Sequence, residues 1–289
     1  MSEKRNEQIP EMSAETRVKF EKLKEILKEM GRVLVAFSGG VDSSLLLKTA
    51  QDVVADGVLA VIARSETYPE VEQKEAVRLA EQWGVRYKII QTDELNNPDF
   101  VSNPPTRCYF CKNELFSRLK EIAEAEDIRY VCDGSNREDM EDFRPGAQAA
   151  EELGIRSPLQ EAGLVKDEIR EISKWLGLPT WDKPSLACLS SRFPYGTHID
   201  QGSLKQIAQA EEFLRNQGFK QVRVRHHGQI ARIEVGPEQM EKMLHPGIRS
   251  AVAARLKTLG YSYVTVDIEG YRTGSMNETL DFSAKQNKP

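Results

Sequence analysis

A chain of 289 residues has room for one large domain or two ordinary ones, and hydrophobic residues at 39% with charged residues at 29% give the composition of a folded, water-soluble protein. No apolar run approaches the roughly 20 residues of a membrane-spanning helix, and a net charge of −5 argues against a broad nucleic-acid-binding surface. Four cysteines are too few for a disulfide scaffold, so we expect reduced thiols that serve metal binding or catalysis.

The first part of the chain alternates predicted helices and strands. Its polar start, residues 1–13, predicts a loose tail rather than an export signal, and we expect a cytoplasmic protein. Apolar spacing then predicts, in order, a helix at 14–30, a strand at 32–37, a helix from Ser43, a strand at 58–63, a helix at 70–84, a strand at 85–92, a helix at 111–127 and a strand at 128–134. This alternation predicts an α/β fold, a parallel sheet with helices on both faces.

The pattern changes after Pro179. Residues 180–200 show no period and predict an irregular loop. After it we expect a helix at 204–218, strands at 221–227 and 230–235, helices near 237–244 and 248–259, and a strand at 263–268. The sequence therefore predicts a first domain at 14–184 and a smaller α+β domain at 185–289.

The stretch VAFSGGVDSSLLLK, residues 35–48, joins the first predicted strand to a helix. Glycines let backbone N–H groups approach a ligand closely, and a helix start adds partial positive charge. The loop therefore suits a phosphate group, with Ser38, Ser43 and Ser44 as hydroxyl donors. Asp42 would cap the helix or, with Mg²⁺, hold phosphate oxygens. The alternative is an ordinary strand–helix turn with a capping aspartate.

This loop resembles the SGGxDS pyrophosphate loop of the PP-loop ATP pyrophosphatases, which include GMP synthetase, asparagine synthetase and the tRNA-thiolating enzymes. It lacks the lysine of GxxxxGK[ST] and the spacing of GxGxxG. The resemblance implies that ATP gives AMP to an acyl or carbonyl oxygen and that pyrophosphate leaves. The ATP-binding residues that it implies are Ser38, Gly39, Gly40, Val41, Asp42 and Ser43. Ser65 after the second strand and Gly134 after the fourth would border the adenine.

Longer stretches resemble the LarE-type sulfur transferases. They are EDMEDFRPGAQAAEELGIRSPL at 138–159, SLACLSSRFPYGT at 185–197, VRVRHHGQIARIE at 222–234 and GYRTGSMNETL at 270–280. Members of this family make the organic part of the nickel-pincer cofactor of lactate racemase. They adenylate a carboxylate of a pyridinium mononucleotide and replace AMP with sulfur, which leaves a thiocarboxylate. Relatives form higher oligomers, so the resemblance also allows a homo-oligomer.

The cysteines bear on the source of that sulfur. Some family members sacrifice one cysteine, and its position falls at Ala187 or, with one residue of slip, at Cys188. Cys108 and Cys111 stand at i and i+3, which puts both thiols on one side of a helix. With Cys188 they resemble the three-cysteine members, in which a [4Fe-4S] cluster leaves one iron open to bind sulfide. We favour that cluster as the sulfur source over sacrifice of Cys188, and we assign Cys132 to the core.

Two other roles suit the CxxC pair. One is a redox couple, and the other is a zinc site completed by His226 or His227. We expect both histidines at the surface or in the turn rather than as metal ligands.

Arg223 and Arg225 alternate with valines on a predicted strand, so both point to one face. Two adjacent guanidinium groups repel each other unless an anion lies between them, which suits a substrate phosphate. A solvated strand face is the alternative, and the LarE resemblance favours the phosphate. The same resemblance implies that further residues lie near the substrate, namely Lys112, Ser191, Arg192 and Glu211.

Three other functions fit parts of the sequence. tRNA thiolation shares the loop and the three cysteines but calls for a basic face, and an amide ligase would use ammonia without a cysteine trio. A nucleotide sensor would bind ATP without releasing pyrophosphate. We expect a mononucleotide and a sulfide donor as partners, and neither a membrane nor nucleic acid.

Overall fold

The apolar runs form a parallel sheet in the computed structural model, which describes residues 12–140, 145–184, 187–272 and 274–279. Its strands are β1 (Val33–Ala36), β2 (Val58–Arg64), β3 (Tyr87–Gln91) and β4 (Tyr130–Cys132). They pair in parallel in the order β3-β2-β1-β4. Short runs of Val, Leu and Ile suit such strands, because helices bury both faces of a parallel sheet.

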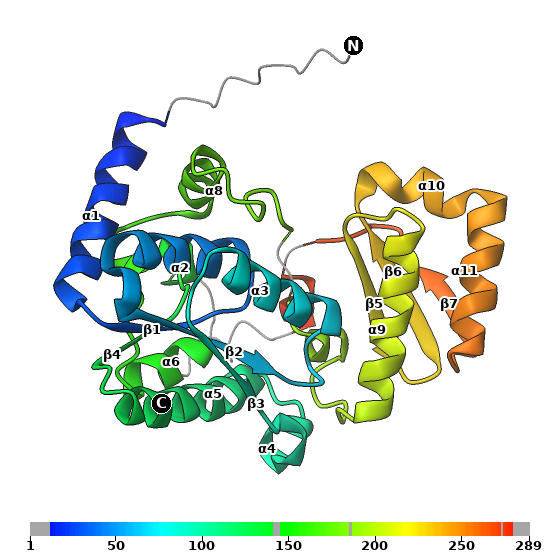
Figure 1. Ribbon diagram of the computed structural model, residues 1–289. Helices are drawn as coiled ribbons and strands as arrows, with labels where there is room; N and C mark the ends of the chain where they lie inside the picture. Colours follow the sequence, from blue (N-terminus) through cyan, green and yellow to red (C-terminus); the bar gives the residue numbers. More distant parts are fainter. Residues whose placement is uncertain (1–11, 141–144, 185–186, 273, 280–289) are drawn as a thin grey trace, which may run out of the picture. The chain divides into compact units, whose positions relative to one another are not determined.

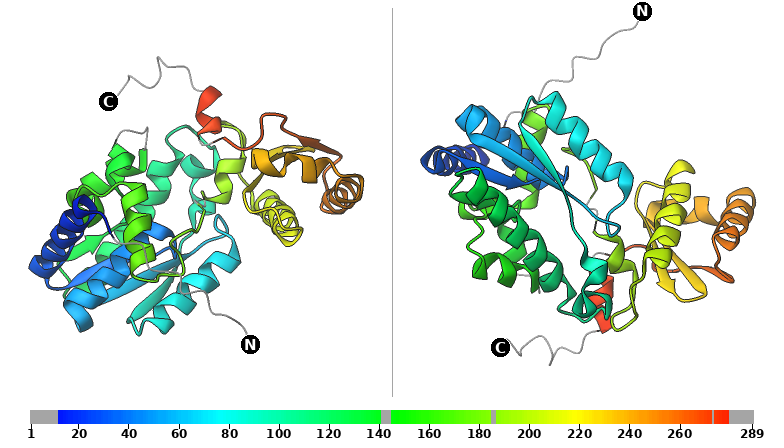
Figure 2. Two further views of the ribbon diagram at one scale, coloured as in Figure 1. Left: turned by 90° about the horizontal axis from the view of Figure 1, so that it is seen from above. Right: turned by 60° about the horizontal axis from the view of Figure 1, so that its bottom comes forward.

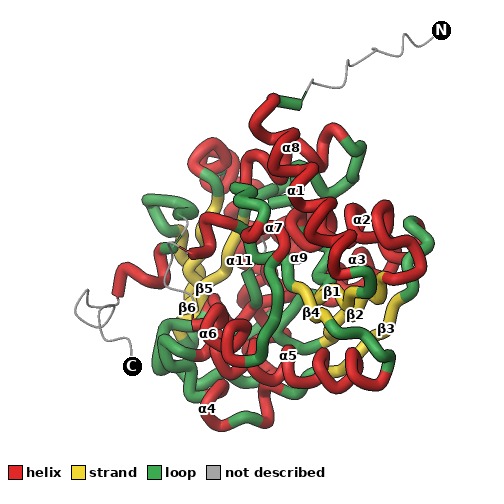
Figure 3. Tube along the Cα trace, turned by 90° about the vertical axis from the view of Figure 1, so that its left-hand side faces the viewer, coloured by secondary structure: helices red, strands yellow, loops and turns green. Residues whose placement is uncertain are grey.

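The helices of this part of the chain are α1 (Ala14–Met30), α2 (Val41–Val54), α3 (Glu70–Gln82), α4 (Pro98–Val101), α5 (Arg107–Ala125), α6 (Pro145–Glu152), α7 (Pro158–Glu161) and α8 (Lys166–Trp175). Figure 1 shows α1, α2, α3 and α8 on one face of the sheet and α5 and α6 on the other, and Figure 3 shows the same layers from the side. The predicted α/β fold is confirmed.

The core of this layered part is apolar. α1 buries Phe20, Leu23 and Leu27 at helical spacing, and Ser13 Oγ caps the helix by accepting a hydrogen bond from the Thr16 N–H at 3.1 Å. Cys132 is fully buried in this core, and burial raises the pKa of its thiol far above the ordinary value. The core assignment of Cys132 is confirmed.

Some elements differ from the predictions. The helix expected from residue 111 begins at Arg107, so Cys108 lies inside it. α4, α6, α7 and α8 were not predicted. Residues 1–11 of the predicted tail lie outside the described residues. Among the described residues, no helix combines the length and the apolar character that a membrane span needs.

A second, smaller sheet follows. Its strands are β5 (Val222–His227), β6 (Ile230–Val235) and β7 (Tyr263–Val266), and its helices are α9 (Gln201–Asn216), α10 (Met240–Leu244) and α11 (Pro246–Thr258). β5 and β6 form an antiparallel hairpin, and β7 pairs in parallel with β6. Figure 2 shows α9 and α11 on the same face of this sheet, where they bury an apolar core against β5 and β6.

The chain divides into two units. The first comprises residues 1–64, 70–92 and 111–186, and the second comprises residues 65–69, 93–110 and 187–289. The second unit thus takes two short stretches from the earlier half of the sequence.

Candidate functional site

The loop between β1 and α2 has the shape of an anion cradle. Gly39 has a left-handed φ of +69°, and a Cβ there would lie 3.1 Å from the Ala76 Cβ on α3, so glycine suits the position on both counts. The hydroxyls of Ser38 and Ser43 lie 3.0 Å apart, and the Gly40 N–H lies 3.4 Å from Ser38 Oγ. Because α2 begins directly after this loop, its N-terminus adds partial positive charge.

Asp42 does not cap α2. The N-cap residue is Gly40, which makes no side-chain capping bond. The Asp42 carboxylate instead accepts a hydrogen bond from Asn136 Nδ2 at 3.2 Å and pairs with the ammonium group of Lys166. The capping interpretation is therefore wrong, and a lysine 124 positions away along the chain holds this carboxylate.

Two further contacts shape the loop. Gly134, which follows β4, packs so closely on α2 that a Cβ would lie 3.0 Å from Ser43 N. The ammonium group of Lys183 donates to the Gly39 carbonyl oxygen at 3.0 Å and pairs with Glu72 at 2.6 Å. Lys166 and Lys183 were missed from the sequence, because no local spacing links them to the loop.

Ser65 follows β2, as predicted, and is almost fully buried. Its hydroxyl donates to Glu94 Oε2 at 2.7 Å and lies 2.9 Å from Thr67 Oγ1. The Leu189 N–H donates to the Thr67 carbonyl oxygen at 2.7 Å, which ties this short stretch to the loop after Cys188. These residues belong to the second unit, and the adenine contact of Ser65 stays a prediction.

The three predicted ligand cysteines differ in exposure and in unit. Cys108 is exposed, while Cys111 and Cys188 are partly exposed. Cys108 and Cys111 lie on α5, and Cys188 precedes a 3-10 helix at Leu189–Arg192. Cys108 and Cys188 belong to the second unit and Cys111 to the first.

Thiolates are the right donors for an iron–sulfur cluster. The described residues contain no group of three or more His, Cys, Asp or Glu side chains placed to hold a metal ion. The chemistry of the donors thus fits the cluster, and the gathering of the three cysteines around it stays a prediction. The zinc site and the redox couple likewise stay alternative predictions for Cys108 and Cys111.

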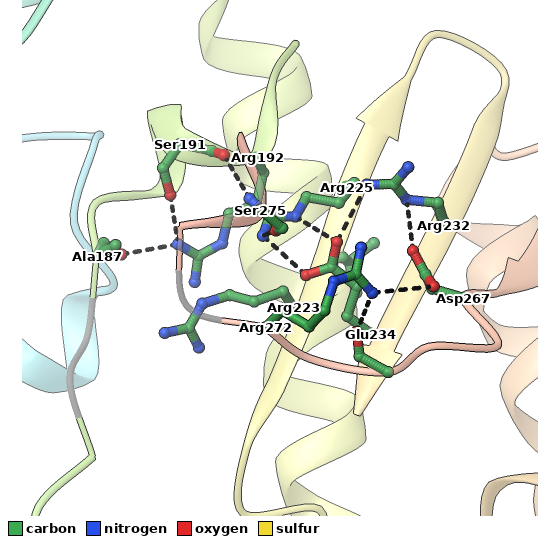
Figure 4. Close-up of polar contacts among 12 residues, drawn as sticks. Ala187, Ser191, Arg192, Arg223, Arg225, Arg232, Glu234, Asp267, Arg272 and Ser275 are labelled. Atoms are coloured by element: carbon green, nitrogen blue, oxygen red, sulfur yellow. Dashed lines mark hydrogen bonds and ion pairs between the residues drawn. The ribbon is translucent and has the colours of Figure 1, made fainter. Parts of the chain in front are cut away.

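In the second unit Arg192 makes a buried ion pair, and Figure 4 shows its hydrogen bonds to Ala187 and Ser191. Arg192 Nε and Nη2 donate to the two carboxylate oxygens of Glu211 at 2.7 and 2.9 Å, and both side chains are almost fully buried. Arg192 Nη1 donates at 2.8 Å to the Ala187 carbonyl oxygen and to Ser191 Oγ. Arg192 therefore fixes the start of the loop that carries Cys188.

A second buried pair lies on the small sheet. Arg225 Nε and Nη2 donate to Glu234 at 2.8 and 2.7 Å. Its remaining donors reach the Ser191 carbonyl oxygen at 2.8 Å and Ser275 Oγ at 2.9 Å. Arg225 thus connects β5 to the segments on either side of it in Figure 4.

Arg223 has a different setting. Its guanidinium group lies 5.1 Å from the centroid of the Tyr271 ring, and in Figure 4 it points away from Glu234 and Asp267. Burial and the nearby charge of Arg192 lower the pKa of Arg223 to about 10, so the group is still cationic at neutral pH. An anion that entered beside Arg223 would favour the charged form of this arginine.

Arg223 and Arg225 of β5 are both buried, so the alternative that they lie on a solvent-exposed face of the strand is wrong. Val222 and Val224 pack in the core with α9, and strand alternation directs Arg223 and Arg225 to the other face. The same alternation buries His226, whose Nδ1 lies 3.2 Å from the Tyr261 hydroxyl.

The expected surface position is therefore wrong for His226, while His227 is exposed. Burial lowers the pKa of both histidines.

The last predicted substrate residue, Lys112, lies on α5 with its ammonium group 5.1 Å from the centroid of the Phe116 ring.

One family profile and several relatives match this sequence. The profile, described as NAD synthase, matches residues 15–122. An uncharacterized protein of Synechocystis sp. is 44% identical over 262 residues, which cover 91% of this chain and 98% of that protein. The pyridinium-3,5-bisthiocarboxylic acid mononucleotide synthase of Lactiplantibacillus plantarum is 42% identical over 255 residues, 88% of this chain and 92% of the synthase. One component of the glutamine-hydrolyzing GMP synthase of Archaeoglobus fulgidus is 26% identical over 170 residues, 54% of this chain and 55% of that component.

Proposed function

The chain belongs to the LarE-type family of PP-loop enzymes, and on that basis we propose that it is an ATP-dependent sulfur transferase acting on a pyridinium mononucleotide. The observation that carries the proposal is the 42% identity, over nearly the whole of both chains, with a synthase named for a bisthiocarboxylic acid mononucleotide. The role we propose is biosynthesis of the nickel-pincer cofactor of lactate racemase.

The first step makes a carboxylate reactive. One carboxylate oxygen attacks the α-phosphorus of ATP, the bond to the β-phosphate breaks, pyrophosphate leaves and an acyl adenylate forms. The loop from Ser38 to Ser43 would hold the phosphates through N–H groups and hydroxyls. Lys183, bonded to the Gly39 carbonyl oxygen and paired with Glu72, supports this role by holding the loop in place. Mg²⁺ prefers phosphate and carboxylate oxygens, and Asp42 is the carboxylate that we assign to it.

The second step brings in sulfur. A sulfur anion attacks the acyl carbon, AMP leaves with the electrons of the carbon–oxygen bond, and a thiocarboxylate forms. We propose that Cys108, Cys111 and Cys188 hold a [4Fe-4S] cluster, which would supply sulfide when bound. The accessibility of these three thiols supports the assignment, since a sulfur donor must reach the substrate. Sacrifice of Cys188, which would end as dehydroalanine, is the alternative source.

We assign the mononucleotide phosphate to Arg223, with Ser191 and Arg192 beside it. The burial of Arg223 and the nearby charge of Arg192, which lower the pKa of Arg223, support this, because an anion bound beside Arg223 would favour its charged form. Arg225 and Glu211 would serve the same site by holding their partners through buried ion pairs. Lys112 stays a proposed substrate contact.

The test uses the full chain, purified without oxygen and incubated with ATP, Mg²⁺, sulfide and a pyridinium-3,5-dicarboxylic acid mononucleotide. We expect pyrophosphate and AMP in equal amounts and a product in which sulfur has replaced oxygen, detected by its mass. Formation of ADP, or no pyrophosphate with this acceptor, would overturn the proposal.

Cysteine variants separate the two sulfur sources. If a cluster delivers sulfur, Cys108→Ser, Cys111→Ser and Cys188→Ser should each lower the bound iron and abolish repeated turnover. If Cys188 is sacrificed, Cys108→Ser should still complete one turnover per chain, and the protein should lose the mass of one H₂S.

A further inference from the structure

Lys166 places a cation at the start of a helix, beside the phosphate loop. It is the first residue of α8, where the helix dipole favours anions, and Asp167 and Glu168 after it follow that preference. Its ammonium group pairs with Asp42, which lies in the first turn of α2 and 124 positions away along the chain. Both side chains are partly exposed, 25% for Lys166 and 22% for Asp42, so a ligand can reach the pair. The position of Lys166 is therefore explained better by the site than by the helix.

The two carboxylate oxygens of Asp42 are held in different ways. Oδ1 accepts a hydrogen bond from Asn136 Nδ2 at 3.2 Å. Asn136 is buried and fixed, because its Oδ1 accepts from the Glu138 N–H at 3.0 Å and its own N–H donates to Asp139 Oδ2 at 2.9 Å. Oδ2 instead meets the end of a long, flexible lysine side chain. Oδ2 is therefore the oxygen whose partner can be exchanged.

Two lysines contact this loop, and they differ in how firmly they are held. The ammonium group of Lys183 has two partners, the Gly39 carbonyl oxygen at 3.0 Å and Glu72 at 2.6 Å. In the part of the chain that the structure describes, the ammonium group of Lys166 has one partner, Asp42. A lysine ammonium group carries three N–H donors. Two donors of Lys166 are therefore left for a ligand.

Mg²⁺ and Lys166 compete for the same carboxylate oxygen. Mg²⁺ is doubly charged and prefers oxygen ligands, and two cations on one oxygen repel each other. Binding of Mg²⁺ to Asp42, as proposed above, therefore displaces the ammonium group. The same event brings the phosphates of ATP to the loop that adjoins Asp42. These phosphates carry more negative charge than the carboxylate that the lysine gives up.

We propose that Lys166 is a displaceable counter-ion of Asp42 and a ligand of the pyrophosphate part of ATP. It neutralises Asp42 before the nucleotide binds, and it transfers its ammonium group to the phosphates when Mg²⁺ takes the carboxylate. There it stabilises the negative charge that develops on pyrophosphate as the bond between the α- and β-phosphates breaks. This role rests on the proposed function, in which ATP releases pyrophosphate, but binding alone can test it.

The test measures the binding of inorganic pyrophosphate to the full chain by calorimetry, with metal removed by chelation. Asp42→Asn keeps the size of the side chain and removes its charge, so it releases the lysine as Mg²⁺ would. Asp42→Asn should bind pyrophosphate at least about tenfold more tightly than the double variant with Lys166→Gln, which lacks a charged hydrogen bond to phosphate. With Mg²⁺ present, Lys166→Gln alone should weaken pyrophosphate binding by a similar factor, and Lys166→Arg should keep most of the affinity.

Lys48→Gln is the matched control, because Lys48 also pairs with an aspartate of α2, Asp52. It should leave the pyrophosphate affinity unchanged, with and without Asp42→Asn. Should the Lys166→Gln chains fail to fold, the wild-type lysines are acetylated with acetic anhydride and the rates are read from peptide masses. Mg²⁺ and pyrophosphate together should then protect Lys166 from acetylation and leave the rate at Lys48 unchanged.

The proposal is overturned if Asp42→Asn binds pyrophosphate equally with and without Lys166→Gln. The displaced ammonium group would then turn to another anion, such as Glu138, whose carboxylate accepts the Lys166 N–H at 3.1 Å. An equal loss of affinity in Lys48→Gln, or no protection of Lys166 from acetylation, would overturn it too. A chain that shows the expected binding differences but makes no pyrophosphate with the mononucleotide would contradict the proposed function alone.

Discussion

Single residues determine whether the phosphate loop can form. A Cβ on Gly134 would lie 3.0 Å from Ser43 N and 3.2 Å from Ser43 Cα, and both atoms are backbone of the first turn of α2. Gly134→Ala must therefore push the start of α2 away from β4. Overpacking of this kind costs about 1–3 kcal/mol, so we expect ATP to bind about tenfold more weakly, measured by calorimetry.

Gly247→Ala is the control for that change. The nearest atom to its added Cβ is His245 Nδ1 at 3.7 Å, an ordinary contact, so nucleotide affinity should not change. If Gly134→Ala folded normally and bound ATP as tightly as the wild type, Gly134 would have no part in the nucleotide site.

We expect Arg223 to contribute to binding of the mononucleotide and not to binding of ATP. Arg223→Gln removes a charge from the proposed phosphate site, and charged hydrogen bonds contribute about 1.5–3 kcal/mol each. We expect the KM for the mononucleotide to rise at least about tenfold while the KM for ATP stays the same. Arg255→Gln, on α11, should change neither value; equal effects of Arg223→Gln on both substrates would contradict the assignment.

At the scale of elements, apolar runs and helical spacing predicted the parallel sheet, the small sheet and most of the helices that join their strands. α8 was missed although Ile169 and Ile172 recur at helical spacing and are fully buried, so a signal was present. Contacts between distant elements carry no such signal. Nothing local links Lys183 to Gly39, which are 144 positions apart.

The residues of the candidate site also fall into two groups, those that the local sequence predicts and those that it does not. The loop residues could be predicted because they are consecutive and lie between a strand and a helix. His226 was misplaced because the two-residue period of β5, which was used for the arginines, was not carried on to the next position. The partners of the buried arginines, Glu211 and Glu234, lie on separate elements and became visible only when those elements packed.

Glu211 ties α9 to the loop and to β5. Its carboxylate accepts hydrogen bonds from Arg192, from Arg215 and from the Val224 N–H, and it is fully buried. Removing one partner of a buried ion pair costs about 3–5 kcal/mol. Glu211→Gln should therefore move the urea midpoint of the far-UV circular dichroism transition to lower concentration.

Tryptophan fluorescence and pH refine this test. Trp83, Trp175 and Trp181 all belong to the first unit, so the urea midpoint measured by their fluorescence should move less.

The effect of Glu211→Gln should also depend on pH. Burial would raise the pKa of Glu211, but the neighbouring arginines outweigh it and hold the pKa below the ordinary value. The carboxylate therefore stabilises the fold above its unfolded pKa of about 4.3 and loses this effect as the pH falls further. An effect of Glu211→Gln that did not shrink below about pH 4 would contradict this account.

At the scale of the whole molecule, the net charge predicts that the protein does not bind nucleic acid non-specifically. A net charge of −5 repels the phosphate backbone, and non-specific binding by basic proteins is already only about 10⁻⁴–10⁻⁶ M at physiological salt. We expect no shift of bulk tRNA by micromolar protein in a gel at about 150 mM salt. A tight, salt-sensitive shift would instead favour tRNA thiolation as the function.

The second unit is assembled from three stretches of chain, residues 65–69, 93–110 and 187–289. Backbone and side-chain bonds join these stretches, from Leu189 to Thr67 and from Arg107 to Ser190. A single recombination crossover anywhere in the gene would therefore split this unit or carry part of its neighbour along.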